Sequence, residues 1–323
     1  MTNPGRPAPR VSVVVPTYNR ADLLPQAIDS VLRQAFVSFE LLVVDDGSTD
    51  DTDRVVARFE DDRILYLRQP HSGLPAVARN TGMRRARGEF IAFLDSDDLW
   101  LPEKLACQVE QMDARPELGL VYANAYRFVD DPRQHDPRDL LLKPGQGVAG
   151  EAFERLYGRP VIPNLTVMIR SSVVAKTGLF DEDPRLKANE DYDYWLRIAH
   201  EYSIGYLDRP LALYRHHAQG ISKATLATYQ AKLFLLEKLD RAYPEFVARH
   251  PEKRSRWLAT IHYGLGRELL RGDRAMEARS HLRQSWAIEP RPATLLFLAA
   301  AYLGKGVYGR LDGAMSRRQG GGR

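Results

Sequence analysis

The stretch Val11–Tyr18 reads VSVVVPTY, and it sets how the rest of the chain is interpreted. It is a nearly continuous run of β-branched residues, which is typical of a strand that is buried on both faces of a parallel sheet. The next segment, Arg20–Gln34, carries apolar residues at helical spacing and predicts a helix. A strand that leads directly into a helix is the building unit of an α/β sheet.

The alternation of strand and helix continues as far as residue 95. The segments are short and their connections are short, as in layered α/β proteins. The further strands are predicted within 39–46, 63–70 and 89–95, and the further helices at 51–60 and 74–86. The predicted fold class is therefore α/β, with an open, mostly parallel sheet flanked by helices on both faces.

Polar clusters fall where the predicted strands end. PTYN (16–19) follows the first strand, DDGS (45–48) the second and DSDD (95–98) the fourth, while the helix at 74–86 follows the third. Parallel strands end at one edge of their sheet, and the ligands of such sheets bind at that edge. The sequence therefore predicts a ligand site that these clusters share.

Three aspartates stand within Asp95–Asp98, directly after a buried strand. Carboxylates repel one another, and removing them from water is costly without a cation or a hydrogen-bond donor. A bound metal resolves this conflict, and so does a plain helix-capping turn in water. The residues taken singly leave similar alternatives elsewhere: a turn at DDGS, a helix cap at Asp191, a salt bridge at Arg79 and a solvated His217.

The pattern divides the chain into four regions. Residues 1–10 are expected to be a flexible tail, and residues 11–222 to form the α/β domain. Residues 223–310 are expected to be helical, with a tetratricopeptide-like hairpin in GRELLRGDRAMEARSHLRQSWAIEP (266–290). Residues 311–323 are expected to be disordered.

Composition limits the classes of protein that fit. The hydrophobic share of 44% and the charged share of 27% are those of a globular protein in water. Cys107 is the only cysteine, so an internal disulfide framework and a cysteine zinc cluster are excluded. The start MTNPGRPAPR lacks the apolar core of a signal peptide, and ATLLFLAAAYLG (293–304) is too short to cross a bilayer. A cytoplasmic location is expected.

The basic character of the chain belongs to its last part. Residues 241–323 contain 16 basic and 7 acidic side chains, whereas the preceding 240 residues contain 30 and 35. A basic helical region is able to contact an anionic membrane peripherally at the inner face of the cell membrane, although it is also what a solvated helical face looks like. No nucleic-acid-reading motif accompanies it, so no nucleic-acid partner is expected.

Four motifs together resemble the family-2 glycosyltransferases, which are inverting enzymes with the GT-A nucleotide-sugar fold. They are VSVVVPTYNR, LLVVDDGSTDDT, ARNTGMRRARGEFIAFLDSDD and NEDYDYWLRIA, and they occur in the family's order. The resemblance covers Val11 to Ser222, and the C-terminal helical part lies outside it. It implies a mostly parallel nucleotide-binding sheet of the GT-A type with a helical C-terminal extension.

The resemblance implies roles for the residues of the first motifs. Pro16, Thr17 and Tyr18 would frame the nucleoside of the donor. Asp46, the second aspartate of DDGS, would accept a hydrogen bond from a pyrimidine ring. Arg79, in ARN, would lie near the nucleotide and its diphosphate.

The DxD motif of the family corresponds to Asp95, Ser96 and Asp97. The resemblance places Asp95 and Ser96 at the nucleotide and gives Asp97 the divalent metal, Mn²⁺ or Mg²⁺. His217 matches the histidine of a YRxH pattern that can complete the metal site in the family. Magnesium and manganese prefer oxygen ligands and take only one or two carboxylates beside substrate phosphates, which fits this set.

The implied reaction moves a sugar from a nucleotide diphosphate donor, expected to be a UDP-sugar, to an acceptor hydroxyl. The acidic pair before the later helix puts Glu190 on the acceptor side and makes Asp191 the general base. A positioned carboxylate is needed because an alcohol does not lose its proton at neutral pH unaided. The acceptor would be a glycan, a lipid-linked sugar or a protein, in polysaccharide biosynthesis of the cell envelope.

Two other classes of protein are alternatives to this one. A catalytically inactive sugar-nucleotide-binding or interaction protein of the same fold is opposed by the presence of Asp95, Asp97 and Asp191. A dinucleotide-dependent oxidoreductase needs a G-x-G-x-x-G turn after the first strand, and the corresponding PTYNRAD contains no glycine.

Overall fold

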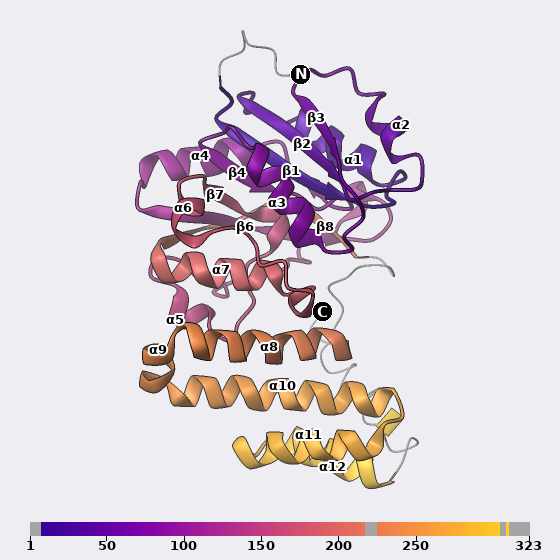
Figure 1. The fold of residues 1–323 in the computed structure, drawn as a ribbon, viewed down its shortest axis with the longest axis vertical. Coiled ribbons are helices and arrows are strands. Elements are labelled where there is room, and N and C mark those ends of the chain that lie inside the picture. The colour runs from indigo at the N-terminus through magenta and orange to yellow at the C-terminus, as the bar shows by residue number, and fades with distance from the viewer. Residues whose placement is uncertain (1–7, 217–224, 304–307, 310–323) are drawn as a thin grey trace. The chain divides into compact units, whose positions relative to one another are not determined.

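The computed structural model describes residues 8–216, 225–303 and 308–309, and it divides into two compact units (Figure 1). The sheet unit comprises Met1–Pro184 with Glu190–Gly220. The helical unit comprises Arg185–Asn189 with Ile221–Arg323. The boundary predicted between residues 222 and 223 and the predicted tail at 311–323 lie outside the described residues, as does most of the tail at 1–10.

The sheet unit is built on one eight-stranded sheet with the order β3-β2-β1-β4-β7-β6-β8-β5. The strands β3, β2, β1 and β4 run parallel, β6 and β8 are parallel to each other, and β7 and β5 run antiparallel to their neighbours. The strands are β1 (Val11–Thr17), β2 (Phe39–Asp45), β3 (Ile64–Arg68), β4 (Phe90–Phe93), β5 (Leu99–Trp100), β6 (Leu118–Phe128), β7 (Met168–Arg170) and β8 (Ser203–Arg215). The predicted fold class, a mostly parallel α/β sheet, is confirmed.

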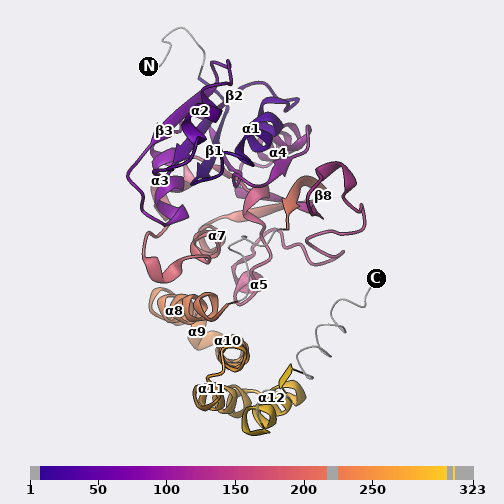
Figure 2. The ribbon, with the colours of Figure 1, turned by 90° about the vertical axis from the view of Figure 1, so that its right-hand side faces the viewer.

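Helices cover both faces of the sheet (Figures 1 and 2). The residues of β1 with odd numbers, such as Val13, join the side chains of α1 and α4 in one apolar cluster. On the opposite face, Gly82 of α3 meets Val14, and Phe93 of β4 packs on Trp195 of α7. The helices of this unit are α1 (Leu24–Leu32), α2 (Thr52–Val56), α3 (Pro75–Arg85), α4 (Lys104–Ala114), α5 (Phe153–Leu156), α6 (Val173–Thr177) and α7 (Glu190–Glu201).

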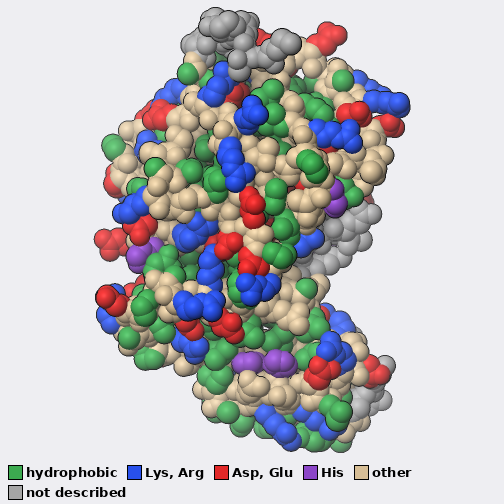
Figure 3. Space-filling model, viewed as in Figure 1, with side chains coloured by type: hydrophobic (Ala, Val, Ile, Leu, Met, Phe, Trp, Pro, Cys, Tyr) green, Lys and Arg blue, Asp and Glu red, His purple; other side chains and the backbone are tan. Residues whose placement is uncertain are grey.

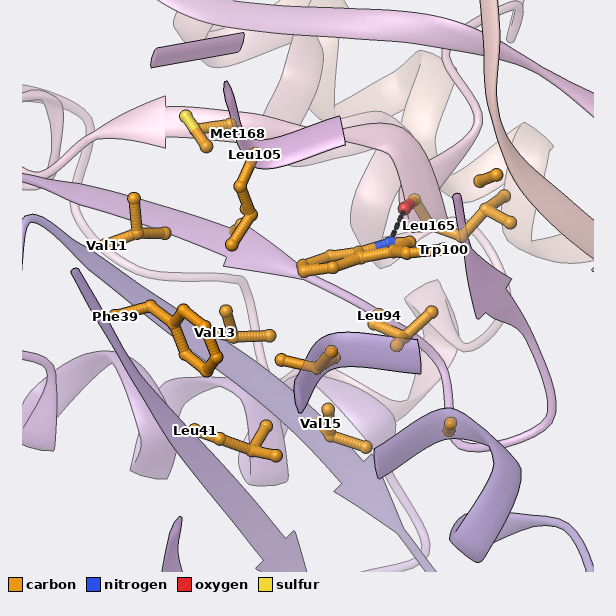
Figure 4. Close-up of a cluster of buried hydrophobic side chains, with 14 of the residues drawn as sticks. Val11, Val13, Val15, Phe39, Leu41, Leu94, Trp100, Leu105, Leu165 and Met168 are labelled. Carbon is orange, nitrogen blue, oxygen red and sulfur yellow. Dashed lines mark hydrogen bonds between the residues drawn. The ribbon is translucent and has the colours of Figure 1, made fainter. Parts of the chain in front are cut away.

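The cluster between β1 and the α1/α4 layer is the core of the unit (Figure 4). Trp100 lies in it with 4% of its surface exposed and donates its indole N–H to the carbonyl of Leu165 at 2.7 Å. A buried indole of this kind contributes a large apolar area and keeps its one polar atom satisfied. The core thereby ties the loop that precedes β7 to the parallel part of the sheet.

The helical unit consists of antiparallel helices with their own apolar core. Its helices are α8 (Leu226–Ala242), α9 (Pro244–Arg249), α10 (Pro251–Arg271), α11 (Ala275–Ile288) and α12 (Pro292–Leu303). The turn between α10 and α11 is made by Gly272 and Asp273, and Asp273 has a positive φ of 62°. Within the described part of the chain, none of the helices combines the length and the apolarity that crossing a bilayer requires. Basic and acidic side chains are interspersed over the face of the molecule in Figure 3.

Gly88, between α3 and β4, allows the closest backbone approach at the N-terminal edge of the sheet. It is buried, and a Cβ added there would lie 2.6 Å from the backbone nitrogen of Ser12 and 2.8 Å from the carbonyl oxygen of Phe90. Backbone atoms held in a sheet cannot yield as a flexible side chain can. A residue larger than glycine must therefore separate β1 from β4 locally.

We expect Gly88→Ala to lower the free energy of unfolding of the sheet unit by about 1–3 kcal/mol, which is typical of overpacking. Urea denaturation followed by circular dichroism measures the change. The matched control is Arg85→Ala, at an exposed position three residues earlier, which should alter stability by less than about 0.5 kcal/mol. Equal stability of the two variants would contradict the close approach at Gly88.

Candidate functional site

The register of the sheet brings the ends of the parallel strands to one edge. Thr17 at the end of β1 pairs with Asp45 at the end of β2, and Asp45 pairs with Arg68 at the end of β3. Residue 14 of β1 pairs with Phe93, the last residue of β4, so the DSDD segment continues from the same edge. The polar clusters that follow these strands therefore emerge on one side of the sheet.

Asp46 holds the loop that connects β3 to α3. Its buried carboxylate accepts hydrogen bonds from Nε2 of Gln69 at 2.7 Å and from the backbone nitrogens of Ser72 and Gly73 at 3.0 Å each, and Nδ1 of His71 lies 3.0 Å away. Burial alone would raise the pKa of Asp46, but the donors outweigh it, led by Gln69, and the pKa is lowered. Asp46 is thus an ionised acceptor that organises a loop.

Tyr18 lies against the same loop. Its ring stacks on the ring of His71, with 3.9 Å between the ring centres and 20° between the planes, and 40% of Tyr18 remains exposed. The backbone nitrogen of Asp46 donates to the carbonyl of Thr17 at 2.9 Å. The structure therefore brings Thr17, Tyr18 and Asp46 together, and it adds His71, which the sequence pattern did not single out.

Arg79 joins the end of β4 to the start of α7. Its guanidinium donates from Nη1 to Oε1 of Glu190 and from Nη2 to Oδ1 of Asp95, both at 2.8 Å, and only 5% of the residue is exposed. A buried guanidinium must be paired, because an uncompensated buried charge is strongly destabilising. The salt-bridge role that the sequence left open for Arg79 is real, and it connects three elements.

Asp191 follows Glu190 in the first turn of α7. Burial raises its pKa to about 6, the charge of Glu190 adds to the rise, and the charge of Arg79 opposes it. Asp95 also raises the pKa of Asp191, so these two carboxylates lie within electrostatic range of each other. The structure therefore gathers Arg79, Asp95, Glu190 and Asp191 into one cluster.

Arg215, the last residue of β8, holds the DSDD segment through hydrogen bonds. The backbone nitrogen of Arg215 donates to Oδ1 of Asp98 at 2.8 Å, its Nε donates to the carbonyl of Asp97 at 2.8 Å, and its Nη2 donates to Oε1 of Gln26 at 2.7 Å. Asp98 is 2% exposed; burial raises its pKa well above the ordinary value, and the charges of Asp97 and Asp95 raise it further. Arg215 stands in YRHH (214–217), the motif that ends in His217.

Asn164 is a second residue of the site that no sequence pattern indicates. It opens the short 3₁₀ helix Asn164–Thr166, and its Nδ2 donates to both carboxylate oxygens of Asp95, at 3.1 and 3.0 Å. Its Oδ1 is buried and has no hydrogen-bond partner in the part of the chain that the structure describes. A lone asparagine within IPNLT carries no pattern that would have identified it.

The remaining predicted residues are placed as follows. Pro16 is partly exposed within β1, Ser96 is 8% exposed directly after Asp95, and Asp97 is partly exposed. His217 lies outside the described residues. Among the residues that are described, no group of three or more His, Cys, Asp or Glu side chains is arranged to hold a metal ion.

Comparison with known proteins identifies the family. A family model described as Glycosyl transferase family 2 matches residues 12–177, just over half of the chain. An uncharacterized glycosyltransferase of Rickettsia felis (strain ATCC VR-1525 / URRWXCal2) is 34% identical over 208 residues, which are 64% of this chain and 33% of that protein. The chain thus spans about a third of the length of that relative.

Two further comparisons concern a better-covered relative and a solved structure. The UDP-Glc:alpha-D-GlcNAc-diphosphoundecaprenol beta-1,3-glucosyltransferase WfgD of Escherichia coli is 32% identical over 196 residues, 60% of this chain and 71% of that protein. The mannosyltransferase PcManGT from Pyrobaculum calidifontis, solved in complex with GDP-Man and Mn²⁺, matches with a TM-score of 0.62 at 22% identity, over 98% of this chain and 88% of that one. The latter likeness confirms the GT-A type of fold. The chain belongs to glycosyl transferase family 2.

Proposed function

We propose that this protein is an inverting glycosyltransferase that moves a sugar from a nucleotide diphosphate donor to an acceptor hydroxyl. The observation that carries the proposal is the buried bridge from Asp95 through Arg79 to Glu190, with Asp191 beside it. It joins the acidic motif at the end of the parallel sheet to a carboxylate from a distant helix. A donor site needs the acidic motif, and an in-line attack from the opposite side needs the carboxylate from the distant helix.

A UDP-sugar is the proposed donor. The printed name of WfgD specifies UDP-Glc, whereas the solved mannosyltransferase holds GDP-Man. Tyr18 offers an exposed ring for stacking, and Asp46 an ionised acceptor for a pyrimidine N–H. Because Asp46 already accepts several donors, we propose that the base replaces His71, whose half-exposed ring now lies on Tyr18.

Mn²⁺ or Mg²⁺ is the proposed cofactor at the donor end of the site. Three carboxyl groups stand within Asp95–Asp98, and burial, followed by the charges of Asp97 and Asp95, raises the pKa of Asp98. Asp97 is the proposed principal ligand, with Asp95 near it and His217 as a further candidate. When bound, the ion would offset the negative charge of the departing diphosphate.

Asp191 is the proposed general base. As the acceptor oxygen bonds to the sugar carbon and the bond to the diphosphate breaks, the acceptor proton passes to the carboxylate of Asp191. A pKa near 6 leaves this carboxylate ionised at neutral pH while making it more basic than an ordinary aspartate. Glu190, held by Arg79, is proposed to face the acceptor.

A lipid-linked sugar is the proposed acceptor class, in the synthesis of a cell-envelope polysaccharide. The support is the name of WfgD, whose acceptor is a diphosphoundecaprenol-linked GlcNAc. A glycan or a protein acceptor remains the alternative outcome of an acceptor screen. A cytoplasmic location and membrane contact through the basic helical region remain predictions from sequence and charge.

We expect Asp97→Ala to abolish metal-dependent transfer, because the diphosphate loses its counter-charge. The assay measures nucleoside diphosphate released from UDP- and GDP-sugars with Mn²⁺, with Mg²⁺ and with a chelator. The control is Asp136→Ala, at an exposed loop position where the carboxylate pairs with Arg138; it should retain turnover. Normal turnover of Asp97→Ala would refute the metal assignment, and no release with any nucleotide sugar would refute the proposed activity.

We expect Asp191→Asn to slow transfer by about 10²- to 10⁴-fold while leaving donor binding intact, because the amide cannot take up a proton. In the wild-type protein, kcat/KM should rise through pH 6 and level off above it, since only the ionised carboxylate acts as a base. The Asn variant should lose this rise. A variant with an unchanged rate and pH profile would instead favour the binding protein without catalysis.

A further inference from the structure

Four buried polar atoms without a hydrogen-bond partner in the described part of the chain belong to residues of the site. They are Oγ1 of Thr17, Nε of Arg79, Oδ1 of Asn164 and Oε2 of Glu190. Buried polar atoms are normally hydrogen-bonded, so an unpaired one in a native fold calls for a reason. A ligand that supplies the missing partners is a reason that fits a site at the edge of the sheet.

Asn164 is the most informative of these residues because its orientation is determined. It is 7% exposed, and its Nδ2 donates to both oxygens of Asp95, at 3.1 and 3.0 Å. The reversed amide would set its carbonyl oxygen against a carboxylate, which is repulsive. The amide oxygen is therefore directed away from the Asp95 carboxylate, and it can only accept a hydrogen bond.

The backbone that carries Asn164 is anchored in the core. The carbonyl of Leu165 accepts the indole N–H of Trp100 at 2.7 Å (Figure 4), and the carbonyl of Thr166 accepts from Nε2 of Gln108 at 2.7 Å. These two bonds anchor the two residues of the 3₁₀ turn that directly follow Asn164. The amide is thus positioned before any ligand arrives, as a recognition group should be.

Glu190, at the other end of the Asp95–Arg79–Glu190 bridge, has a second acceptor atom of this kind. Oε2 of Glu190 is buried and unpaired in the described residues, while Oε1 of the same carboxylate is held by Arg79, which also holds Asp95. Asn164 bonds Asp95 and Glu190 bonds Arg79, so each member of the Asp95–Arg79 pair is bonded to a residue that carries an unpaired acceptor. A ligand that carries several hydroxyl donors suits such a set, whereas diphosphate oxygens, which are acceptors themselves, do not.

We propose that Asn164 determines donor specificity: its Nδ2 orients Asp95, and its Oδ1 accepts a hydrogen bond from one hydroxyl group of the transferred sugar. This inference rests on the proposed function. Asn164 would then discriminate against a sugar that lacks this hydroxyl, because a buried acceptor would be left unpaired in that complex.

Calorimetric titration with Mn²⁺ present tests the role. The probes are UDP-glucose, UDP-N-acetylglucosamine, analogues of each that lack one sugar hydroxyl, and UDP itself. For the wild-type protein we expect one analogue to bind roughly 10-fold or more weakly than its parent, as for a lost hydrogen bond to a buried group. In Asn164→Ala this difference should shrink to within about twofold, while the affinity for UDP should stay within about threefold of that of the wild type.

Two further variants separate hydroxyl recognition from structural support. Asn164→Asp keeps the shape and an acceptor oxygen but repels Asp95, so it should bind every donor more weakly and still discriminate against the same analogue. Asn124→Ala removes a buried amide whose Nδ2 donates to Leu142 O at 2.8 Å and whose Oδ1 accepts from Leu142 N at 3.0 Å. It should lower thermal stability and leave the discrimination unchanged.

Three results would overturn the inference. The first is an Asn164→Ala variant that keeps the full wild-type penalty for the same analogue. The second is an equal loss of affinity for UDP and for UDP-sugars in that variant, because Asn164 would then act only by supporting Asp95. The third is a wild-type protein that binds UDP but no nucleotide sugar more tightly than UDP, and that releases no diphosphate in the transfer assay; this result would refute the proposed function as well.

Discussion

The buried guanidinium of Arg79 is the contact on which the rest of the site depends. It is 5% exposed and must be neutralised where it stands, so Asp95 and Glu190 both have to reach it. Asp95 is 16 residues away in the chain and Glu190 is 111 residues away. The sheet edge, α3 and α7 must therefore all be in place before the charge is satisfied, and the same condition assembles the carboxylates. The ion pairs of Arg79 therefore serve the fold and the site at the same time.

The parallel half of the fold was predictable because each of its strands and helices has a recognisable local sequence pattern. A β-branched run ending in polar residues predicts both β1 and the edge at which it stops, and the same holds for β2 and β4. The antiparallel direction of β5 and β7 was not predictable in this way. β5 has only two residues, which is too short for a periodic pattern, and the direction of β5 and β7 is set by tertiary pairing with β8 and β4. Local sequence thus determines elements, and long-range pairing determines their order.

The site divides in the same manner. Residues within motifs, such as Asp46 and Asp95, could be proposed from sequence because the strand ends place them at one edge. Asn164 could not, since it stands in no motif and its partner Asp95 lies 69 residues away. Arg215 stands in the YRHH motif, but that motif does not reveal that Arg215 holds Asp98, 117 residues away. Arg215 is informative here, because a residue that holds Asp97 and Asp98 by backbone and side-chain bonds contributes geometry rather than chemistry. Sequence motifs reveal the reacting groups more readily than the groups that position them.

The two ends of the site differ in electrostatic character, and this difference bears on what each can bind. Around Asp46, amide and backbone N–H donors outnumber charges, and the pKa of the carboxylate falls despite burial. At Asp98 and Asp191, burial raises both pKa values, and neighbouring carboxylates raise them further. An ionised carboxylate surrounded by N–H donors suits an uncharged heterocycle that offers an N–H group, whereas a region with several carboxyl groups suits a cation and a group that gives up a proton. A nucleotide sugar with its metal spans these two demands, because its base is neutral and its diphosphate needs a cation.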